Sequence, residues 1–309
     1  MALQEWIKNG EARLANGPHP DRAHADAELL LLHLLERDRV FLIAHAEENL
    51  SAEGVARYHA LIDRRLSGEP IQYIVGEVEF YGLPFRVTRD VLIPRHETEL
   101  LVEKVLERIQ SYSSRKPVRI VDVGTGSGAI AVALACKLGP AAQVEITATD
   151  ISAAALELAR KNAELNGVAD RIRFLYGDLL EPVAEERFDF IVSNPPYVPI
   201  GDRESLDMEV REFEPALALF AGVDGLAVYR RLIPDALKVL NPHGMLALEI
   251  GFGQRDGAGA LLYETGFGQV EFFHDLQLIQ RVALAQRRWE MGPPHEIGPG
   301  VYCGVYRPV

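Results

Sequence analysis

The chain has 309 residues, of which 48% are hydrophobic and 25% are charged, values close to those of ordinary globular proteins. Its net charge of -13 offers no electrostatic footprint for nucleic acid, which is bound through basic patches, and instead favours a protein or small-molecule partner. The N-terminus lacks the basic and apolar regions of a signal peptide, and no apolar stretch approaches the ~20 residues of a membrane span. Cys136 and Cys303 form neither a disulfide framework nor a metal-binding spacing. We therefore expect a cytoplasmic protein with no metal site and no membrane contact.

Residues 2 to about 67 are expected to form short helices only. The stretch from Ala25 to Leu35 is apolar around most of a helix, which is typical of a buried core helix. Asp38 and Ser51 are expected to cap two further helices. Because this region has no cluster of catalytic residue types, we expect it to position a partner.

The sequence Ser67-Gly68-Glu69-Pro70 interrupts the helical pattern. Residues 71–76 and 78–82 then predict two strands of a hairpin, and residues 85–87 are a candidate third strand. A helix is expected from Glu97 to about Ile109, with acidic residues in its first turn that complement the helix dipole.

From Val118 onward the pattern alternates between strands and helices, which predicts a doubly wound, mainly parallel sheet of the α/β class. We expect strands at 118–123, 143–149, 171–176, 188–193, 244–250, 268–274 and 278–285, and helices at 128–138, 153–166, 225–240 and 253–265. The last two strands are too close in sequence for a parallel crossover, so they are expected to pair antiparallel. The tail from Trp289 is expected to be irregular, with a strand-like stretch at 301–303.

Four polar motifs follow the ends of apolar runs, and in an open parallel sheet that edge is where ligands bind. The first, Gly124-Thr125-Gly126-Ser127-Gly128, predicts a tight turn that a ligand can approach closely. Its third glycine comes one position early for the dinucleotide fingerprint, which argues against a dehydrogenase. We expect the turn to face the amino-acid part of a ligand.

Two acidic residues mark the ends of the next two strands. Asp150 lies roughly 20 residues beyond the glycines, where a carboxylate can accept hydrogen bonds from both hydroxyls of a ribose. Asp178, which is followed by Leu179, can accept a hydrogen bond from an adenine amino group. Together with the glycine turn, these residues predict a nucleoside site.

The fourth motif, Asn194-Pro195-Pro196-Tyr197, is the most specific. Its prolines fix the backbone and leave carbonyl groups free to accept hydrogen bonds. The Asn194 side chain and the Pro195 carbonyl can accept the two hydrogens of a planar NH2 group, and Tyr197 can supply an aromatic face. Such acceptors would orient the nitrogen lone pair toward an electrophilic methyl group, so no strong general base is required.

Together these motifs, from Asp122 to Tyr197, resemble the class I S-adenosylmethionine-dependent methyltransferases that act on planar NH2 groups. Three further stretches and the helical N-terminal region resemble the peptide chain release factor glutamine methyltransferase family. These stretches are Gly68 to Gly76, Val91 to Glu99, and Pro215 to Gly222 with Asp224-Gly225-Leu226. The resemblance covers roughly residues 20 to 286.

The resemblance implies a Rossmann-like, seven-stranded class I methyltransferase sheet and a small N-terminal helical bundle, joined by a β-hairpin linker. It implies three parts: a release factor docking domain at 1–67, the linker at 68–95 and the catalytic domain at 96–309. S-adenosylmethionine would be bound by Gly124 to Gly128, Asp150, Asp178 and Leu179, with Asn194 also next to it. The family often has an aromatic residue where this chain has Leu179.

The implied reaction transfers a methyl group to the side-chain amide nitrogen of the glutamine in the Gly-Gly-Gln motif of bacterial class I release factors. Asn194, Pro195, Pro196 and Tyr197 would hold that glutamine. Three alternatives stay open: a ribosomal protein glutamine methyltransferase, an N6-adenine nucleic-acid methyltransferase, and a non-catalytic adaptor. The acidic charge balance argues against the nucleic-acid substrate, and intact Asn194 and Asp150 argue against the adaptor.

Overall fold

A computed structural model describes residues 1–112, 117–291, 295–298, 301–303 and 306–308. The chain divides into two compact units, which are described separately. Unit 1 comprises Met1–Glu77, Val87–Arg89 and Ser205–Glu214, and unit 2 comprises Val78–Arg86, Asp90–Glu204 and Pro215–Val309. The functional division at residues 67 and 95 stays a prediction.

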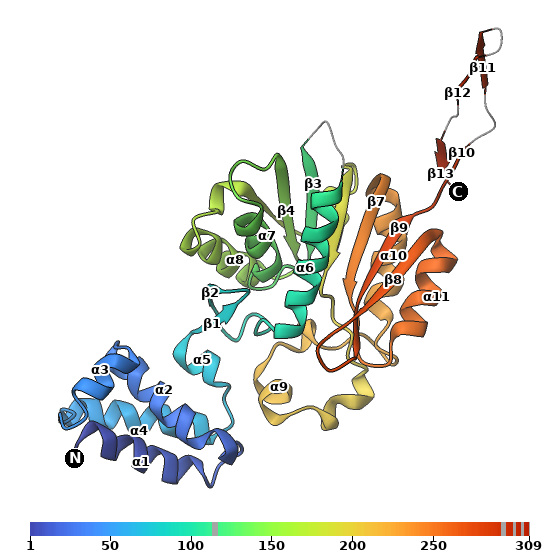
Figure 1. Ribbon diagram of the computed structural model, residues 1–309. Coiled ribbons are helices and arrows are strands. Elements are labelled where there is room, and N and C mark those ends of the chain that lie inside the picture. Colours follow the sequence, from blue (N-terminus) through green and yellow to red (C-terminus); the bar gives the residue numbers. More distant parts are fainter. Residues whose placement is uncertain (113–116, 292–294, 299–300, 304–305, 309) are drawn as a thin grey trace. The chain divides into compact units, whose positions relative to one another are not determined.

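Unit 1 is a small helical bundle (Figure 1). Its helices are α1 (Leu3–Leu14), α2 (Ala23–Leu35), α3 (Arg39–Ala44), α4 (Ala52–Leu66) and α5 (Ile71–Val75), with a 3₁₀ turn at Pro20–Arg22. The side chains of Leu30, Tyr58 and Ile62 are completely buried in its core. Both predicted caps are confirmed, since Asp38 accepts the Phe41 N–H at 2.8 Å and Ser51 accepts the Gly54 N–H at 3.0 Å.

The expected strand at 71–76 is wrong, because these residues form helix α5. The Pro70 carbonyl accepts the N–H groups of Tyr73 and Ile74, and Gly76 ends the helix with a φ of 82°. A short apolar run has no periodicity that separates a buried strand from a helical turn. The hairpin instead pairs β1 (Glu77–Phe80) with β2 (Leu83–Arg86), close to the second and third expected strands.

Unit 1 also includes helix α9 (Met208–Phe213), which comes from much later in the chain. Arg65 of α4 is almost completely buried, and its guanidinium forms ion pairs with Asp26 of α2 and with Glu209 of α9. A buried cation is stable only when such partners satisfy it. These ion pairs therefore anchor residues 205–214 to the bundle.

Unit 2 is built on a seven-stranded sheet with the order β5-β4-β3-β6-β7-β9-β8. The strands are β3 (Val118–Val123), β4 (Val144–Asp150), β5 (Ile172–Tyr176), β6 (Phe188–Ser193), β7 (Leu240–Glu249), β8 (Phe267–His274) and β9 (Gln280–Arg287). The first five of these strands are mutually parallel, and β9 runs antiparallel to both of its neighbours. The predicted parallel sheet with one reversed strand is therefore confirmed.

Helices cover both faces of this sheet (Figure 1). Buried residues of α6 (His96–Ser111), α7 (Ala129–Leu138) and α8 (Ala153–Leu165) form one core, and those of α10 (Ala227–Val239) and α11 (Arg255–Thr265) form the other. In the described part of the chain after β3, four 3₁₀ segments that the sequence did not predict lie at Ala169–Arg171, Glu181–Val183, Ile200–Ser205 and Ala216–Ala218. No helix in the described ranges is long and apolar enough to cross a membrane.

The expectation of an irregular tail is wrong for its described residues. Strand β10 (Trp289–Met291) pairs with β13 (Tyr306–Pro308), and β11 (His295–Gly298) pairs with β12 (Val301–Cys303). A chain that folds back on itself satisfies its backbone N–H and C=O groups by antiparallel pairing. The strand-like stretch at 301–303 is thus confirmed.

Candidate active site

A cavity of about 280 Å³ opens within unit 2, where the parallel strands end. The register places the last residues of β3, β4 and β5 at one edge of the sheet, since Val123 pairs with Thr149 and Asp150 with Tyr176. The cavity is lined by Gly124, Thr125, Gly126, Ser127, Asp150, Asp178, Leu179, Asn194 and Pro196, among others. Gly128, Pro195 and Tyr197 are not part of its lining.

The three glycines of the turn after β3 serve different purposes. Gly124 and Gly126 have φ values of 71° and 56°, and a Cβ at either position would meet no atom within 4 Å. Their backbone is therefore open on the side where a Cβ would stand, which suits close approach by a ligand. Gly128 packs against α8, because a Cβ there would lie 3.0 Å from the Cβ of Ala159.

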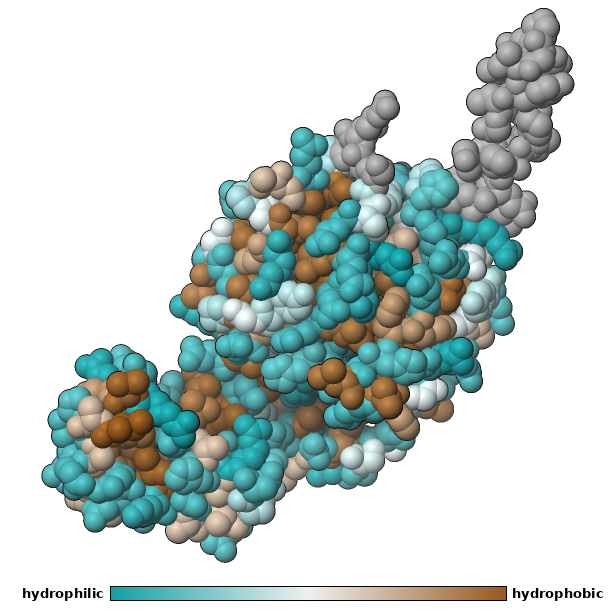
Figure 2. Space-filling model, viewed as in Figure 1, coloured by the Kyte–Doolittle hydropathy of each residue, from teal (hydrophilic) through white to brown (hydrophobic). Residues whose placement is uncertain are grey.

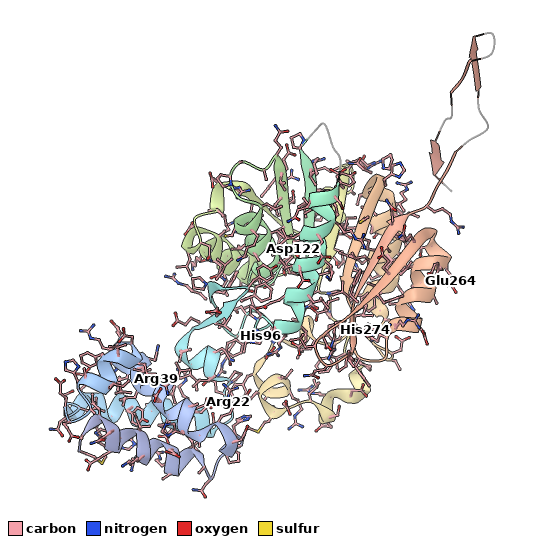
Figure 3. All side chains as sticks on the ribbon, in the orientation of Figure 1. Arg22, Arg39, His96, Asp122, Glu264 and His274 are labelled. Carbon is pink, nitrogen blue, oxygen red and sulfur yellow. The ribbon has the colours of Figure 1, made fainter. Side chains whose placement is uncertain are left out.

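Asp122 of β3, labelled in Figure 3, is completely buried and bonds to the turn and to α7. Its Oδ2 accepts hydrogen bonds from the Thr125 hydroxyl at 2.6 Å and the Ala131 N–H at 3.2 Å. Burial raises the pKa of this carboxyl to about 7, although the bonds from Thr125 and Ala131 oppose the rise. Among the described residues, its Oδ1 has no hydrogen-bond partner. No role for Asp122 was predicted from the sequence.

Asp150 connects the end of β4 to the glycine turn. Its Oδ2 accepts the Gly126 N–H and its Oδ1 accepts the Ser152 N–H, both at 2.8 Å. Burial raises the pKa of Asp150, and the backbone hydrogen bonds limit the rise. A carboxylate has about four lone-pair sites, so two oxygens held in this way can still accept ligand hydroxyls.

Asp178 and Leu179 also line the cavity, and each has a partner that is distant in sequence. The Asp178 carboxylate forms an ion pair with Arg231 of α10, and this bond raises the pKa of the arginine. Leu179 has a φ of 49°, and its carbonyl accepts the Thr149 hydroxyl at 2.9 Å. Arg231 also lines the cavity, although it belongs to none of the four strand-end motifs.

Asn194 follows directly after β6, whose last residue, Ser193, donates its hydroxyl to the Val123 carbonyl at 2.7 Å. The Asn194 Nδ2 donates to the Thr98 Oγ1 at 3.1 Å. The Thr98 hydroxyl in turn donates to Oε2 of Glu249 at 2.6 Å. A single network therefore connects α6, the end of β6 and the end of β7.

Tyr197 is hydrogen-bonded to the carboxylate of Glu249 as well. Its hydroxyl donates to Oε1 of Glu249 at 3.2 Å, and its carbonyl accepts the Gln254 Nε2 at 2.8 Å. Glu249 is buried, and burial raises its pKa to about 7 against the opposing effect of its bonds from Thr98 and Tyr197. Glu249 thus joins the first and last residues of Asn194–Tyr197.

Thr98 lies in the stretch from Val91 to Glu99 that resembles the family, but the sequence predicted no site role for it, nor for Glu249 or Gln254. The contacts of Thr98 with Asn194 and Glu249 span 96 and 151 residues, so no local motif could reveal them. One signal was available for Glu249, which ends a parallel strand as Asp150 does.

The site therefore joins two regions. One has an open glycine backbone and the half-buried carboxylate of Asp150, which suit a polar ligand with hydroxyl and amino groups. The other presents an amide side chain on a rigid backbone, which suits a planar NH2 group. Two such regions in one cavity can bring a group donor and an acceptor nitrogen together.

Two protein-family models match the chain. Residues 5–76 match the PrmC N-terminal domain, and residues 96–212 match the methyltransferase small domain. A release factor glutamine methyltransferase of Geobacter sulfurreducens is 44% identical over 262 residues, covering 85% of this chain and 89% of its own length. One of Moorella thermoacetica is 43% identical over 291 residues, covering 94% of this chain and 100% of its own length.

Solved structures share the fold. The hMettl16 catalytic domain, solved in complex with the MAT2A 3'UTR hairpin 1, has a TM-score of 0.54 at 19% identity and covers 88% of this chain and 94% of its own. The T. thermophilus 16S rRNA methyltransferase RsmC, solved in complex with AdoMet and guanosine, has a TM-score of 0.51 at 22% identity. It covers 69% of this chain and 50% of its own. At these identities the likeness concerns the fold alone.

Proposed function

Because the chain belongs to the family of release factor glutamine methyltransferases, we propose that it methylates a glutamine of bacterial class I peptide chain release factors. The methyl group passes from S-adenosylmethionine to the side-chain amide nitrogen, N5, of the glutamine in the Gly-Gly-Gln motif. The observation that carries this proposal is the Asn194 amide, which lines the cavity beside Gly126 and Asp150.

The cavity residues fit S-adenosylmethionine. The open backbone at Gly124 and Gly126 suits the methionine part, and the two fixed oxygens of Asp150 suit the ribose hydroxyls. Asp178 and Leu179 suit the adenine, with Leu179 giving an apolar contact where the family often has an aromatic ring. When bound, this cofactor supplies an electrophilic methyl group.

The protein's own part in the reaction is to hold and orient the amide. An amide nitrogen is a poor nucleophile because its lone pair is delocalised into the carbonyl group. The Asn194 side-chain oxygen and the Pro195 carbonyl would each accept one hydrogen of the substrate NH2 group and stabilise the charge that develops on nitrogen. Tyr197 lies outside the lining of the cavity but is held at its hydroxyl and its carbonyl, so its ring would present a fixed face to the planar substrate.

The helical bundle is proposed to dock the release factor. Figure 2 shows apolar side chains gathered on the bundle over α2 and α3, where Leu29, Val40 and Ile43 are exposed. Val40 and Ile43 are 72% and 75% exposed, which is unusual for side chains of their type. Exposed apolar groups of this kind mark surfaces that protein partners cover.

The test uses purified protein, labelled S-adenosylmethionine and three separate acceptors. These acceptors are a bacterial class I release factor, the same factor with its Gly-Gly-Gln glutamine replaced, and duplex DNA. The proposal expects label on the intact factor alone. Label on DNA would identify an adenine methyltransferase, and label on the altered factor would place the methyl group at another residue.

A further inference from the structure

The hydrogen bonds behind Asn194 determine which end of its amide faces the cavity. Thr98 has a single hydroxyl proton, and it is directed at Oε2 of Glu249 at 2.6 Å. The Thr98 oxygen must therefore accept in its contact with Asn194, at 3.1 Å, and Asn194 must present its NH2 end. The side-chain oxygen of Asn194 is then the end left for a ligand in the cavity that Asn194 lines.

Glu249 is suited to fix the directions of these hydrogen bonds. Its ionised carboxylate can only accept hydrogen bonds, so it compels both Thr98 and Tyr197 to donate. The side chain is 1% exposed, so no bulk water competes for its oxygens. The Tyr229 hydroxyl further fixes the end of β7 by donating to the Glu249 carbonyl at 2.8 Å.

We propose that Glu249 is a positioning residue which, through Thr98, holds Asn194 with its amide oxygen toward the substrate. This inference rests on the proposed function, because the direction of the oxygen matters only for a substrate that presents an NH2 group. If the amide turned over, its NH2 end would face the substrate hydrogens, and the acceptor described above would be lost.

The hydrogen bonds from Asn194 to Thr98 and from Thr98 to Glu249 form a relay, and the protonation state of Glu249 sets the direction of both bonds. A protonated Glu249 can donate to Thr98, and Thr98 can then donate to the Asn194 oxygen, which reverses the amide. Burial raises the pKa of Glu249 to about 7.

Among the groups that surround Glu249, Arg281 of β9 favours the ionised form and Glu97 of α6 opposes it. The neighbouring Tyr197 and Tyr229 have a raised pKa and stay neutral. Methyl transfer is therefore expected to rise with pH through about pH 7.

Thr98→Val and Thr98→Ser form a matched pair that tests the relay. The valine variant keeps the side-chain shape and removes the hydroxyl, so kcat on the release factor is expected to fall on the order of 100-fold. The serine variant keeps the hydroxyl and is expected to retain most of the activity. Cofactor Kd, measured by calorimetry, is expected to stay unchanged in both. A Thr98→Val kcat within twofold of the unaltered protein would overturn the proposal.

Glu249→Gln tests the role of charge. The glutamine keeps the size of the side chain but does not titrate, so the rise of kcat between pH 6 and pH 8.5 is expected to vanish. A pH profile identical to that of the unaltered protein would contradict the assignment.

A readout that needs no activity separates this proposal from the proposed function. In protein labelled with ¹⁵N at asparagine, the Asn194 side-chain NH2 signal is identified by its loss in Asn194→Asp. Slow hydrogen exchange of that signal is expected in the unaltered protein and fast exchange in Thr98→Val. If exchange is slow in the unaltered protein and fast in Thr98→Val while the release factor stays unmodified, the positioning role of Glu249 is upheld and the proposed substrate is refuted. Equal exchange in the two proteins would refute the positioning role.

Discussion

Asn162 of α8 donates from Nδ2 to the carbonyl of Ser127 at 2.8 Å and thereby holds the glycine turn. The same side chain accepts the Arg86 N–H at 2.7 Å and donates to the Arg86 carbonyl at 3.0 Å. Asn162 has no exposed surface, so water cannot replace these partners. One buried amide therefore joins the candidate cofactor turn to strand β2.

Asn162→Leu is expected to destabilise the protein by about 1–3 kcal/mol, because it leaves buried backbone groups without partners. It should also weaken cofactor binding, since Ser127 would lose a fixed position. Urea denaturation and calorimetry measure the two effects. Asn166→Ala is the control, because the Asn166 bond to the Pro84 carbonyl is exposed to solvent. Equal losses in the two variants would contradict the special role of Asn162.

Asp150→Ala is expected to weaken S-adenosylmethionine binding by about 2–3 kcal/mol, the value of hydrogen bonds to a charged group. The variant also removes the acceptor of the Gly126 N–H, so part of this loss comes from a looser turn. Asp178→Ala is expected to cost less, because its carboxylate is already paired with Arg231 at a partly exposed position. Unchanged cofactor affinity in Asp150→Ala would remove this residue from the ribose site.

Asn194→Ala is expected to lower kcat by a factor on the order of 100 to 1,000, as removal of one catalytic hydrogen-bonding group does. Cofactor affinity should stay mostly intact, because the proposed cofactor contacts are mainly those of Gly124, Gly126 and Asp150. Single-turnover kinetics and calorimetry on the same preparation separate the two properties. Loss of cofactor binding with the rate of the bound complex preserved would refute this division of roles.

Gly225→Ala is expected to displace the backbone of Tyr197, although the two residues are distant in sequence. A Cβ on Gly225 would lie 2.3 Å from the Tyr197 carbonyl oxygen, so the tyrosine backbone must move. We expect kcat to fall on the order of 100-fold, the effect of a displacement near 1 Å. Gly167→Ala is the matched control, because its φ of 69° is close to the 73° of Gly225 but its Cβ would meet no atom within 4 Å. A similar loss of kcat in both variants would assign the effect to backbone strain alone.

Asp122 is expected to make stability depend on pH. Its pKa rises from an ordinary value of 3.8 to about 7 in the folded protein, so the folded state binds more protons between these values. The free energy of unfolding contributed by this group therefore falls as pH rises from about 4 to about 7 and is level outside that window. Asp122→Asn should reduce the fall, with a remainder from Glu249, whose pKa is also raised. Denaturation curves across this range test the claim, and an unaltered slope would contradict it.

The sheet could be predicted from sequence because fully buried parallel strands contain near-continuous apolar runs, as Phe190 to Val192 of β6 shows. The two predicted helix caps depend on contacts three residues apart, which a sequence displays directly. Residues 71–76 were wrongly expected to form a strand, because burial in the bundle and the Pro70 carbonyl decide the local conformation.

The candidate site could be predicted only in part, because some of its residues belong to local motifs and others act through contacts between distant parts of the chain. Strand-end motifs such as Asp150 and Asn194 are local, and parallel topology brings them to one edge. Thr98 and Glu249 act through contacts that span 151 and 96 residues, and these exist only once the sheet and α6 have packed. In the sequence alone, Thr98 and Glu249 cannot be distinguished from ordinary residues of a helix and a strand.

The central claim is methyl transfer to one glutamine side chain, and mass spectrometry of the release factor tests it most directly. The factor is incubated with the protein and S-adenosylmethionine, digested, and fragmented peptide by peptide, with Asn194→Ala as the inactive control. Our account predicts one added methyl group on the glutamine of the Gly-Gly-Gln peptide and none in the control. A methyl group on any other residue, or an unmodified glutamine in a reaction that consumes the cofactor, would contradict it.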